Sequence, residues 1–264
     1  MNEQLSLDGR IAVVTGAAGG IGASLVRTLV SRGARVVAVD VDADALDRLV
    51  SDVGSAVVAH QADVSNLGHW QLVRARAEHL EGRLAVLVNN AGVLHHQRLA
   101  DVERDTWAAT LDVNLKGTWL GMKVLAPALR EAGGGSIVNV SSAAGLDQHP
   151  DAAYTASKWG VRGLTKTAAQ EFGEWSVRVN SIHPGLIRTG MGSSAPGAAA
   201  RAMLSLMPIA RPGDATDVAE LVAFLASDAA AFITGAEIAV DGGWTSGVQM
   251  AGARRSWRET AKHE

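Results

Sequence analysis

Short apolar segments recur along this chain between longer amphipathic segments, and this alternation restricts the folds that the chain can adopt. Most of the short segments are rich in Val, Ile and Ala, which is typical of strands buried on both faces. The predicted strands cover residues 11–14, 35–39, 56–59, 85–88, 136–140, 177–182 and 237–240, and the predicted helices cover 20–32, 43–52, 66–81, 101–131, 151–173 and 215–227. This order predicts an α/β protein with a doubly wound, seven-stranded parallel sheet and helices on both faces. Because no change of composition marks a second domain, we expect a single domain over residues 1–250, followed by a tail over 251–264.

The composition argues against several classes of function. With 24 Lys and Arg against 27 Asp and Glu, the chain has a formal net charge of −3 and no field that would attract nucleic acid or an anionic membrane. No apolar run approaches the ~18 residues of a membrane span, and the N-terminus lacks a secretory pattern, so we expect a cytoplasmic protein. The absence of cysteine excludes disulfides and thiolate metal sites, and we expect no bound metal.

A glycine-rich segment, Thr15-Gly16-Ala17-Ala18-Gly19-Gly20-Ile21-Gly22, directly follows the first predicted strand and opens the first predicted helix. Glycines permit a tight turn there and let the backbone approach a pyrophosphate, which the N–H groups at the helix N-terminus would then face. The spacing G-x-x-x-G-x-G differs from the commoner G-x-G-x-x-G, so the prediction depends on the strand before the loop and the helix after it.

An acidic residue, Asp40, ends the second predicted strand, eighteen residues after Gly22. A carboxylate at this place accepts hydrogen bonds from adenosine ribose hydroxyls and repels a 2′-phosphate. Neither Gly19 nor Val41 supplies a cation that would neutralise such a phosphate, so we expect NAD rather than NADP. A helix N-cap role for Asp40 would leave the choice open. Asp63 and Val64 follow the third predicted strand, where they suit the adenine edge.

Polar residues also follow the fourth and fifth predicted strands. Asn89-Asn90-Ala91-Gly92 would seat a ribose and hold the central strands in register, and Ser141-Ser142 lies at the same carboxyl edge, where open α/β sheets bind ligands. Ser142 stands twelve residues before Tyr154, the only tyrosine of the chain.

Tyr154 stands four residues before Lys158, so on a helix the two side chains share a face. A phenol titrates near ~10, and an adjacent ammonium lowers that pKa toward neutrality. Such a phenol can exchange a proton with a substrate oxygen. The spacing alone is also compatible with a chance lysine neighbour, and the other motifs decide between the two interpretations.

Together these motifs resemble the short-chain dehydrogenase/reductase family, single-domain type, over about residues 7 to 245. The resemblance rests on the glycine-rich loop, Asn89 to Gly92, a serine before Tyr154 and Lys158, and His183-Pro184-Gly185 after the sixth predicted strand. It implies a Rossmann-type fold with Tyr154 as general acid/base, Lys158 lowering the phenol pKa, Ser142 polarising the carbonyl and Asn114 completing a proton relay. The residues that we expect to bind the cofactor are Gly16, Gly20, Ile21, Gly22, Asp40, Asp63, Val64, Asn90, Ala91, Gly92, Tyr154, Lys158, Pro184, Gly185, Ile187 and Thr189.

The substrate is less well defined by the sequence. Bacterial 3α(20β)-hydroxysteroid dehydrogenases are similar to this chain over residues 136–146, 158–164 and 180–185. Most of this similarity concerns the framework of the fold and therefore says little about the substrate pocket. The segment 147–151 is polar and shorter than in the steroid enzymes, and we place residues 94–96, with His95 and His96, across the cleft from it. A substrate-binding flap is predicted over 190–212, in which Met191, Met203 and Met207 either form an apolar lid or merely pack the flap.

These observations predict an NAD-dependent oxidoreductase that interconverts a secondary alcohol and a ketone on an apolar cyclic or steroid-like substrate. A 3-oxoacyl thioester reductase is an alternative, although such enzymes usually use NADPH and Asp40 argues against it. A non-catalytic sensor of the nicotinamide cofactor is a second alternative, but it would be expected to lose the acid/base residues. The resemblance also implies a homotetramer built on the helices at 101–131 and 151–173, whereas the roles of His149 and of the tail stay open.

Overall fold

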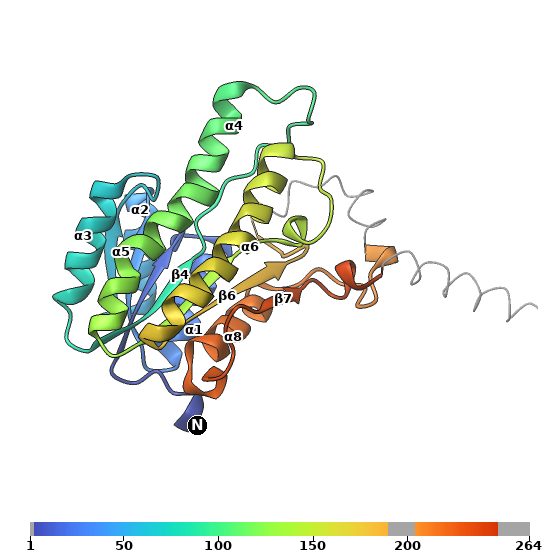
Figure 1. The fold of residues 1–264 in the computed structure, drawn as a ribbon. Coiled ribbons are helices and arrows are strands. Elements are labelled where there is room, and N and C mark those ends of the chain that lie inside the picture. Colours follow the sequence, from blue (N-terminus) through green and yellow to red (C-terminus); the bar gives the residue numbers. More distant parts are fainter. Residues whose placement is uncertain (1–2, 190–203, 248–264) are drawn as a thin grey trace, which may run out of the picture.

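The computed structural model describes residues 3–189 and 204–247, and its centre is one parallel sheet (Figure 1). The seven strands lie in the order β3-β2-β1-β4-β5-β6-β7, and every neighbouring pair is parallel. The strands are β1 (Arg10–Thr15), β2 (Arg35–Asp40), β3 (Val57–Gln61), β4 (Arg83–Asn89), β5 (Gly135–Val140), β6 (Val177–Pro184) and β7 (Glu237–Val240). The predicted seven-stranded parallel sheet is thus confirmed, with each strand close to its predicted position.

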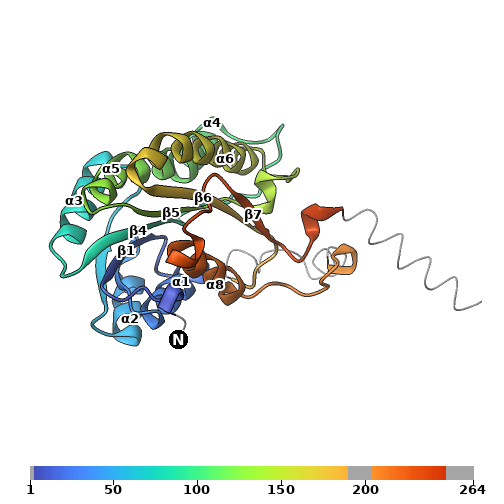
Figure 2. The ribbon, with the colours of Figure 1, turned by 60° about the horizontal axis from the view of Figure 1, so that its bottom comes forward.

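Helices cover both faces of the sheet, as Figure 2 shows from the side. On one face lie α1 (Gly20–Ser31), α2 (Ala43–Val53) and α8 (Ala215–Ala226), and on the other lie α3 (Leu67–Glu78), α4 (Arg104–Leu111), α5 (Gly117–Glu131) and α6 (Ala152–Phe172). None of the helices in the described ranges is both long and apolar enough to cross a membrane.

Two apolar cores result from this layering. Successive side chains of a strand point to opposite faces, so β1 sends Ala12 and Val14 into the core beneath α1 and α8. Ile11 and Val13 of the same strand enter the core beneath α3 and α5. Because β1 is buried on both sides, its sequence is continuously apolar rather than alternating.

The predicted helix over 101–131 is wrong in one respect. It begins at Arg104 and changes at Asp112–Lys116 into a π-helical turn before it continues as α5. Local π-helical geometry comes from one extra residue in a turn, a feature that apolar periodicity does not reveal. This turn carries Asn114, so the difference falls on a predicted site residue.

Part of the predicted flap and all of the predicted tail fall outside the described residues. The flap was placed at 190–212, of which 204–212 is described, and the tail at 251–264. Met207 is the flap methionine that the structure describes, and it is buried with 2% of its surface exposed.

The order of the strands places the functional site. β1 and β4 are neighbours in the sheet, but the connection that leaves β1 runs to β2 on one side and the connection that leaves β4 runs to β5 on the other. In doubly wound sheets a crevice opens at the carboxyl ends of the strands where the order reverses, and ligands bind there. The loops after β1, β4 and β5 all end at this edge.

Candidate active site

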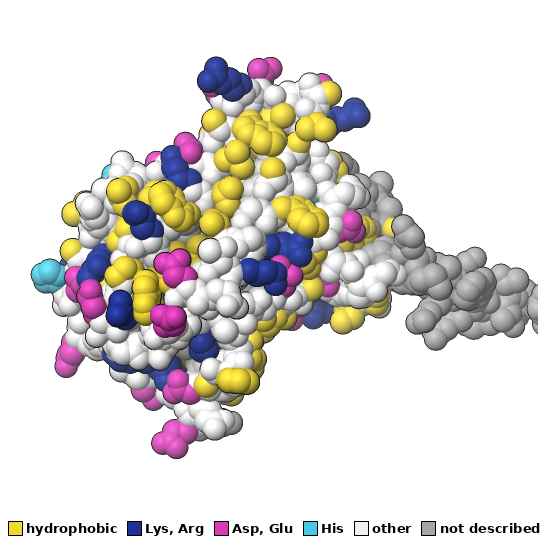
Figure 3. All heavy atoms as spheres, viewed as in Figure 1, with side chains coloured by type: hydrophobic (Ala, Val, Ile, Leu, Met, Phe, Trp, Pro, Cys, Tyr) yellow, Lys and Arg dark blue, Asp and Glu magenta, His cyan; other side chains and the backbone are white. Residues whose placement is uncertain are grey.

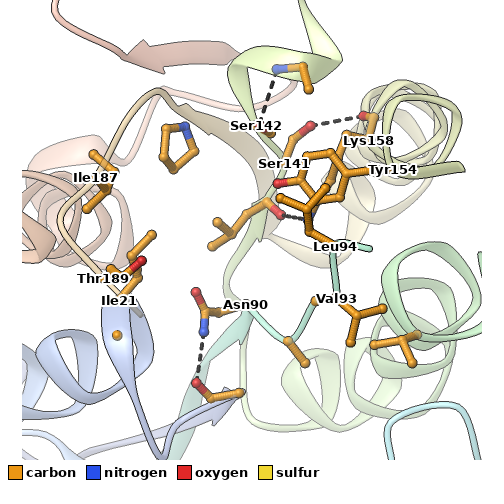
Figure 4. Close-up of a pocket in the computed structure, with 18 of the residues that line it drawn as sticks. Ile21, Asn90, Val93, Leu94, Ser141, Ser142, Tyr154, Lys158, Ile187 and Thr189 are labelled. Atoms are coloured by element: carbon orange, nitrogen blue, oxygen red, sulfur yellow. Dashed lines mark hydrogen bonds between the residues drawn. The ribbon is translucent and has the colours of Figure 1, made fainter. Parts of the chain in front are cut away.

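A cavity of about 890 Å³ opens at the carboxyl edge of the central strands, at the large end of the range for ligand sites. Figure 4 shows Tyr154, Lys158 and Ser142 on one side of it, facing Ile21, Ile187 and Thr189 on the other. Of the predicted site residues, those that line the cavity are Gly16, Gly20, Ile21, Asp40, Asp63, Val64, Asn90, Ala91, Gly92, Ser142, Tyr154, Lys158, Pro184, Gly185, Ile187 and Thr189. Gly22 and Asn114 are not among the lining residues and lie behind the wall.

The glycine-rich loop after β1 is built for close packing. Gly16 has a φ of +61°, and a Cβ on Gly22 would lie 1.8 Å from the Gly16 carbonyl oxygen. Helix α1 begins at Gly20, so the N–H groups of its first turn lack helical partners and face the cavity. This loop therefore has the shape and the polarity of an anion cradle.

Asp40 ends β2 beside this cradle and organises the backbone around it. Its carboxylate accepts hydrogen bonds from the N–H groups of Ala18 at 3.0 Å and Val41 at 2.8 Å. The N-cap of α2 is Asp42, so the carboxylate of Asp40 does not serve as the N-cap of that helix. Since a carboxylate has about four acceptor positions, Asp40 can still accept bonds from a ligand hydroxyl.

Amides at the end of β4 bind the central strands together. The Asn90 side chain, labelled in Figure 4, donates to the carbonyls of Thr15 and Gly16, both at 3.0 Å. Asn89 donates to the Asn139 amide oxygen at 2.8 Å, which ties β4 to β5. Both amides therefore hold the sheet edge in register, and Asn90 also lines the cavity.

Tyr154 and Lys158 lie on the first turns of α6, whose N-cap is Asp151. The Lys158 Nζ atom lies 5.5 Å from the centre of the Tyr154 ring and donates to the Val140 carbonyl at 2.9 Å. Ser142 follows β5 and is close enough to the Tyr154 phenol to influence its pKa. The two helix residues and the loop serine thus converge at one place, as the spacing predicted.

The pKa values at this place differ from the sequence-based expectation. Burial raises the pKa of the Tyr154 phenol, and the hydrogen bond from Ser142 opposes this effect only in part. Burial also lowers the pKa of Lys158 from 10.5 to about 8. The phenol pKa of the protein alone is therefore raised and not lowered as expected, and burial is the largest cause.

Asn114 lies in the π-helical turn and supports the wall of the site. Its side chain accepts from the Val93 N–H at 2.8 Å, and donates to the Val93 carbonyl at 3.0 Å and to Ser157 at 3.1 Å. A Cβ on Gly92 would lie 3.3 Å from the Asn114 amide oxygen and 3.4 Å from Lys158 Nζ. Gly92 therefore lets the loop after β4 pass between these two side chains.

The segment after β6 closes the far side of the cavity. A Cβ on Gly185 would lie 2.8 Å from the Asp241 Cα, so this glycine allows close backbone packing. Ile187 pairs with Gly213 and is buried, and Thr189 approaches Gly20 at the start of α1. The segments that follow β6 and β1 thus meet at the cradle.

Two residues support the site in ways that the sequence did not predict. Buried His183 contacts the Ser142 carbonyl through Nδ1 and Ser181 through Nε2, both at 3.0 Å, which fixes the loop that carries Ser142. Asp151 is buried and accepts from the N–H groups of Tyr154, His95 and Gln97. It therefore joins the start of α6 to the loop after β4, and its place three residues before Tyr154 was the available signal.

The remaining wall surrounds the space in front of Tyr154. The expected juxtaposition of residues 94–96 with 147–151 is confirmed by the bond between the His95 N–H and Asp151. His96 and His149 are among the residues that line the cavity, and His95 is not. Apolar side chains complete this end, namely Val93, Leu94, Leu186, Met207 and Trp244. No group of three or more His, Asp or Glu side chains suited to a metal ion occurs within residues 3–189 and 204–247.

Comparisons with known proteins agree with this geometry. The family model described as enoyl-(acyl carrier protein) reductase matches residues 16–245. Trans-4-hydroxycyclohexanecarboxylate dehydrogenase of Sinomonas cyclohexanicum is 39% identical over 249 residues, covering 90% of this chain and 93% of that protein. A 3-alpha-(or 20-beta)-hydroxysteroid dehydrogenase of Mycobacterium tuberculosis is 40% identical over 243 residues, covering 92% of each. The solved structure of levodione reductase has a TM-score of 0.87 and 30% identity, covering 90% of this chain and 98% of that one.

Proposed function

The chain belongs to the short-chain dehydrogenase/reductase family of oxidoreductases, and on this basis we propose that it interconverts a secondary alcohol and a ketone with NAD(H). The observation that carries the proposal is the convergence of Tyr154, Ser142 and Lys158 at the cavity, opposite the glycine cradle. The cradle fits a dinucleotide because an added Cβ at Gly16 or Gly22 would meet backbone atoms within 3 Å. Its first helical turn presents N–H groups to a pyrophosphate.

The proposed chemistry divides among three side chains. A bound nicotinamide cofactor would accept the hydride during alcohol oxidation and donate it during ketone reduction. Ser142 holds the reacting substrate oxygen through its hydroxyl, and the Tyr154 phenolate takes the proton of the alcohol during oxidation. In the reverse direction the Tyr154 phenol returns this proton to the carbonyl oxygen. Lys158 contributes its positive charge, which favours the phenolate.

The raised phenol pKa gives the two directions opposite pH dependences. Alcohol oxidation requires the phenolate of Tyr154, so its rate increases as the pH rises toward the phenol pKa. Ketone reduction requires the protonated phenol and is therefore favoured at neutral pH. A positive charge near the phenol would lower its pKa and move both profiles toward neutrality.

The preference for NAD over NADP follows from the charges at the adenosine end. Asp40 lines the cavity there beside exposed Val41. Lys158 is the single Lys or Arg among the lining residues within the described ranges, and it lies at the opposite end. A 2′-phosphate would meet the Asp40 carboxylate without a cation to neutralise it.

The apolar wall in front of Tyr154 supports a substrate with an apolar, cyclic body. Relatives named for a hydroxycyclohexanecarboxylate and for hydroxysteroids act on cyclic alcohols of this kind. We assign the same broad class to this chain. The polar His96 and His149 in the same wall favour a substrate that is not purely hydrocarbon.

We further propose that the protein is a homotetramer in which α5 and α6 contact other copies. Trp119 on α5 and Trp159 on α6 are 43% and 47% exposed, which is unusual for tryptophan on the surface of a monomer. Figure 3 shows hydrophobic side chains on the face that carries α4, α5 and α6. Analytical ultracentrifugation tests this assignment, since Trp119→Glu with Trp159→Glu should dissociate the assembly, whereas Leu72→Glu on α3 should not.

The activity is tested by supplying NAD+ or NADP+ with a panel of secondary alcohols and by following the reduced cofactor. We expect turnover with NAD+ on cyclic alcohols and a loss of roughly 10²–10⁴-fold in kcat for Tyr154→Phe. An acetoacetyl thioester with NADPH tests the thioester reductase alternative. Tight NADH binding without turnover of any alcohol or ketone would contradict the proposed activity and favour the sensor.

A further inference from the structure

His149 lies in the wall of the cavity directly beside the proposed acid/base. Its ring centre is 5.6 Å from that of Tyr154, and the two planes are inclined by 56°. The residue precedes Pro150 in the loop between Ser142 and α6, and its carbonyl accepts a hydrogen bond from Thr155 at 3.2 Å. The imidazole therefore lies beside the Tyr154 ring in the wall of the cavity.

Hydrogen bonding determines which nitrogen of His149 carries the proton. The backbone N–H of Asp151 donates to His149 Nδ1 at 3.2 Å, so Nδ1 acts as an acceptor. In a neutral imidazole the other nitrogen then carries the hydrogen, which makes Nε2 the donor. Burial lowers the pKa of His149, in agreement with a neutral ring at physiological pH.

The Nε2–H group has no protein acceptor within residues 3–189 and 204–247. The cavity that it borders is also lined by the apolar residues Leu94, Leu186 and Trp244. A donor in such a place costs free energy unless a ligand or water satisfies it. A ligand that fills the apolar space and supplies one acceptor would therefore be preferred.

We propose that His149 binds a second oxygen of the substrate, separate from the oxygen that reacts at Tyr154. This inference rests on the proposed function and names its substrate class, a cyclic secondary alcohol with a further hydroxyl or carboxylate across the ring. His149 is a substrate-binding residue that contributes specificity and takes no part in proton transfer. The site then favours functionalised alcohols over the parent cyclic alcohol.

The test compares trans-cyclohexane-1,4-diol with cyclohexanol in the wild type and three variants. His149→Phe removes both nitrogens, and His149→Asn keeps an acceptor near the Nδ1 position without a group at the Nε2 position. His149→Gln places an amide N–H near the Nε2 position and should restore part of the preference. Thermal unfolding of each variant reports whether the loop at Asp151 keeps its structure.

We expect the ratio of kcat/KM for the diol to kcat/KM for cyclohexanol to fall about tenfold in His149→Phe and His149→Asn, mainly through KM, because one hydrogen bond is lost. The loss of kcat/KM for cyclohexanol, which lacks the second oxygen, should be smaller than the loss for the diol. An unchanged ratio, or an equal loss on both alcohols, would overturn the inference and leave His149 as a structural residue while the proposed function stands.

Calorimetric titration of the diol against the protein with NADH gives a readout that does not depend on turnover. Binding should weaken about tenfold in His149→Asn and recover in part in His149→Gln. If the wild type oxidises neither alcohol, the proposed function fails, and the titration alone decides the inference. Equal affinity of the wild type and His149→Asn for the diol would contradict it.

Discussion

Lys158 is expected to make the stability of the protein rise between about pH 8 and pH 10.5. The burial of its ammonium lowers the pKa from 10.5 to about 8, which corresponds to about 3 kcal/mol at roughly 1.4 kcal/mol for each pH unit. In this pH range the unfolded chain keeps the proton and the folded chain has released it. The unfolded state therefore binds more protons, and the free energy of unfolding increases with pH.

The replacement Lys158→Met isolates this effect because methionine has a similar length and no charge. At pH 7 the variant gains about 3 kcal/mol from the lost charge but leaves the Val140 carbonyl without its donor, at a cost of about 1–3 kcal/mol. A measurement at a single pH would hence show little. The free energy of unfolding must therefore be compared between the lysine and methionine proteins at two pH values. The cost of the unpaired Val140 carbonyl is the same at every pH, so it does not affect this comparison.

The assay is urea unfolding at pH 7.0 and pH 10.5, followed by far-ultraviolet circular dichroism at one protein concentration. Both arms carry Tyr154→Phe, which removes the titration of the neighbouring phenol. From pH 7.0 to pH 10.5, the free energy of unfolding of the protein with Lys158 should increase by about 3 kcal/mol more than that of the protein with methionine. Lys123→Met on the exposed surface of α5 is the matched control and should parallel the lysine arm.

A relative gain below about 1 kcal/mol would refute the reasoning, because it would mean that the folded protein keeps Lys158 charged at little cost. A relative loss would mean that the site stabilises the ammonium.

Three further predictions concern the framework of the site. Gly22→Ala should lower the melting temperature and abolish NADH binding in calorimetry, because the new Cβ would meet the Gly16 carbonyl at 1.8 Å, whereas Gly19→Ala, with nothing within 4 Å, should keep the wild-type stability. Asp40→Asn should reduce the ratio of NAD+ to NADP+ affinity at least about tenfold in fluorimetric titration, and an unchanged ratio would contradict the role of the carboxylate. Since backbone hydrogen bonds hold the pKa of Asp151 below 3.8, the stability that it contributes is present above that pH and lost as the pH falls further. Asp151→Asn should therefore flatten the acid side of the stability curve, as followed by urea unfolding at pH 2 to 5.

The close packing of the glycine-rich loop could be predicted from the sequence because it depends on the backbone. A cradle for a pyrophosphate needs glycine at places where a side chain would collide, and these collisions are found at Gly16 and Gly22. The acid at the end of the next strand follows from the same topology, because parallel strands end at one edge. Sequence spacing and fold thus specify Asp40 together.

Features that depend on three-dimensional burial were not predictable in this way. The Tyr154 to Lys158 spacing correctly predicted that the two side chains lie together, but it suggested a lowered phenol pKa. The opposite direction results from loss of water around both groups, which no spacing encodes. The π-helical turn at Asn114 was missed for a related reason, since one extra residue in a turn leaves the apolar pattern almost unchanged.

The pKa of Lys158 links the two sides of the site. A buried ammonium at the end of the cavity is unfavourable by itself, and it becomes favourable when hydroxyl groups or a phenolate surround it. In the proposed function, cofactor binding and ionisation of Tyr154 would supply such groups. The buried ammonium of Lys158 lowers the stability of the ligand-free protein. The same charge would then favour the state in which the cofactor is bound and Tyr154 is ionised. The proposed role of His149 follows the same logic for the substrate, because its Nε2–H would favour a molecule that brings a second oxygen.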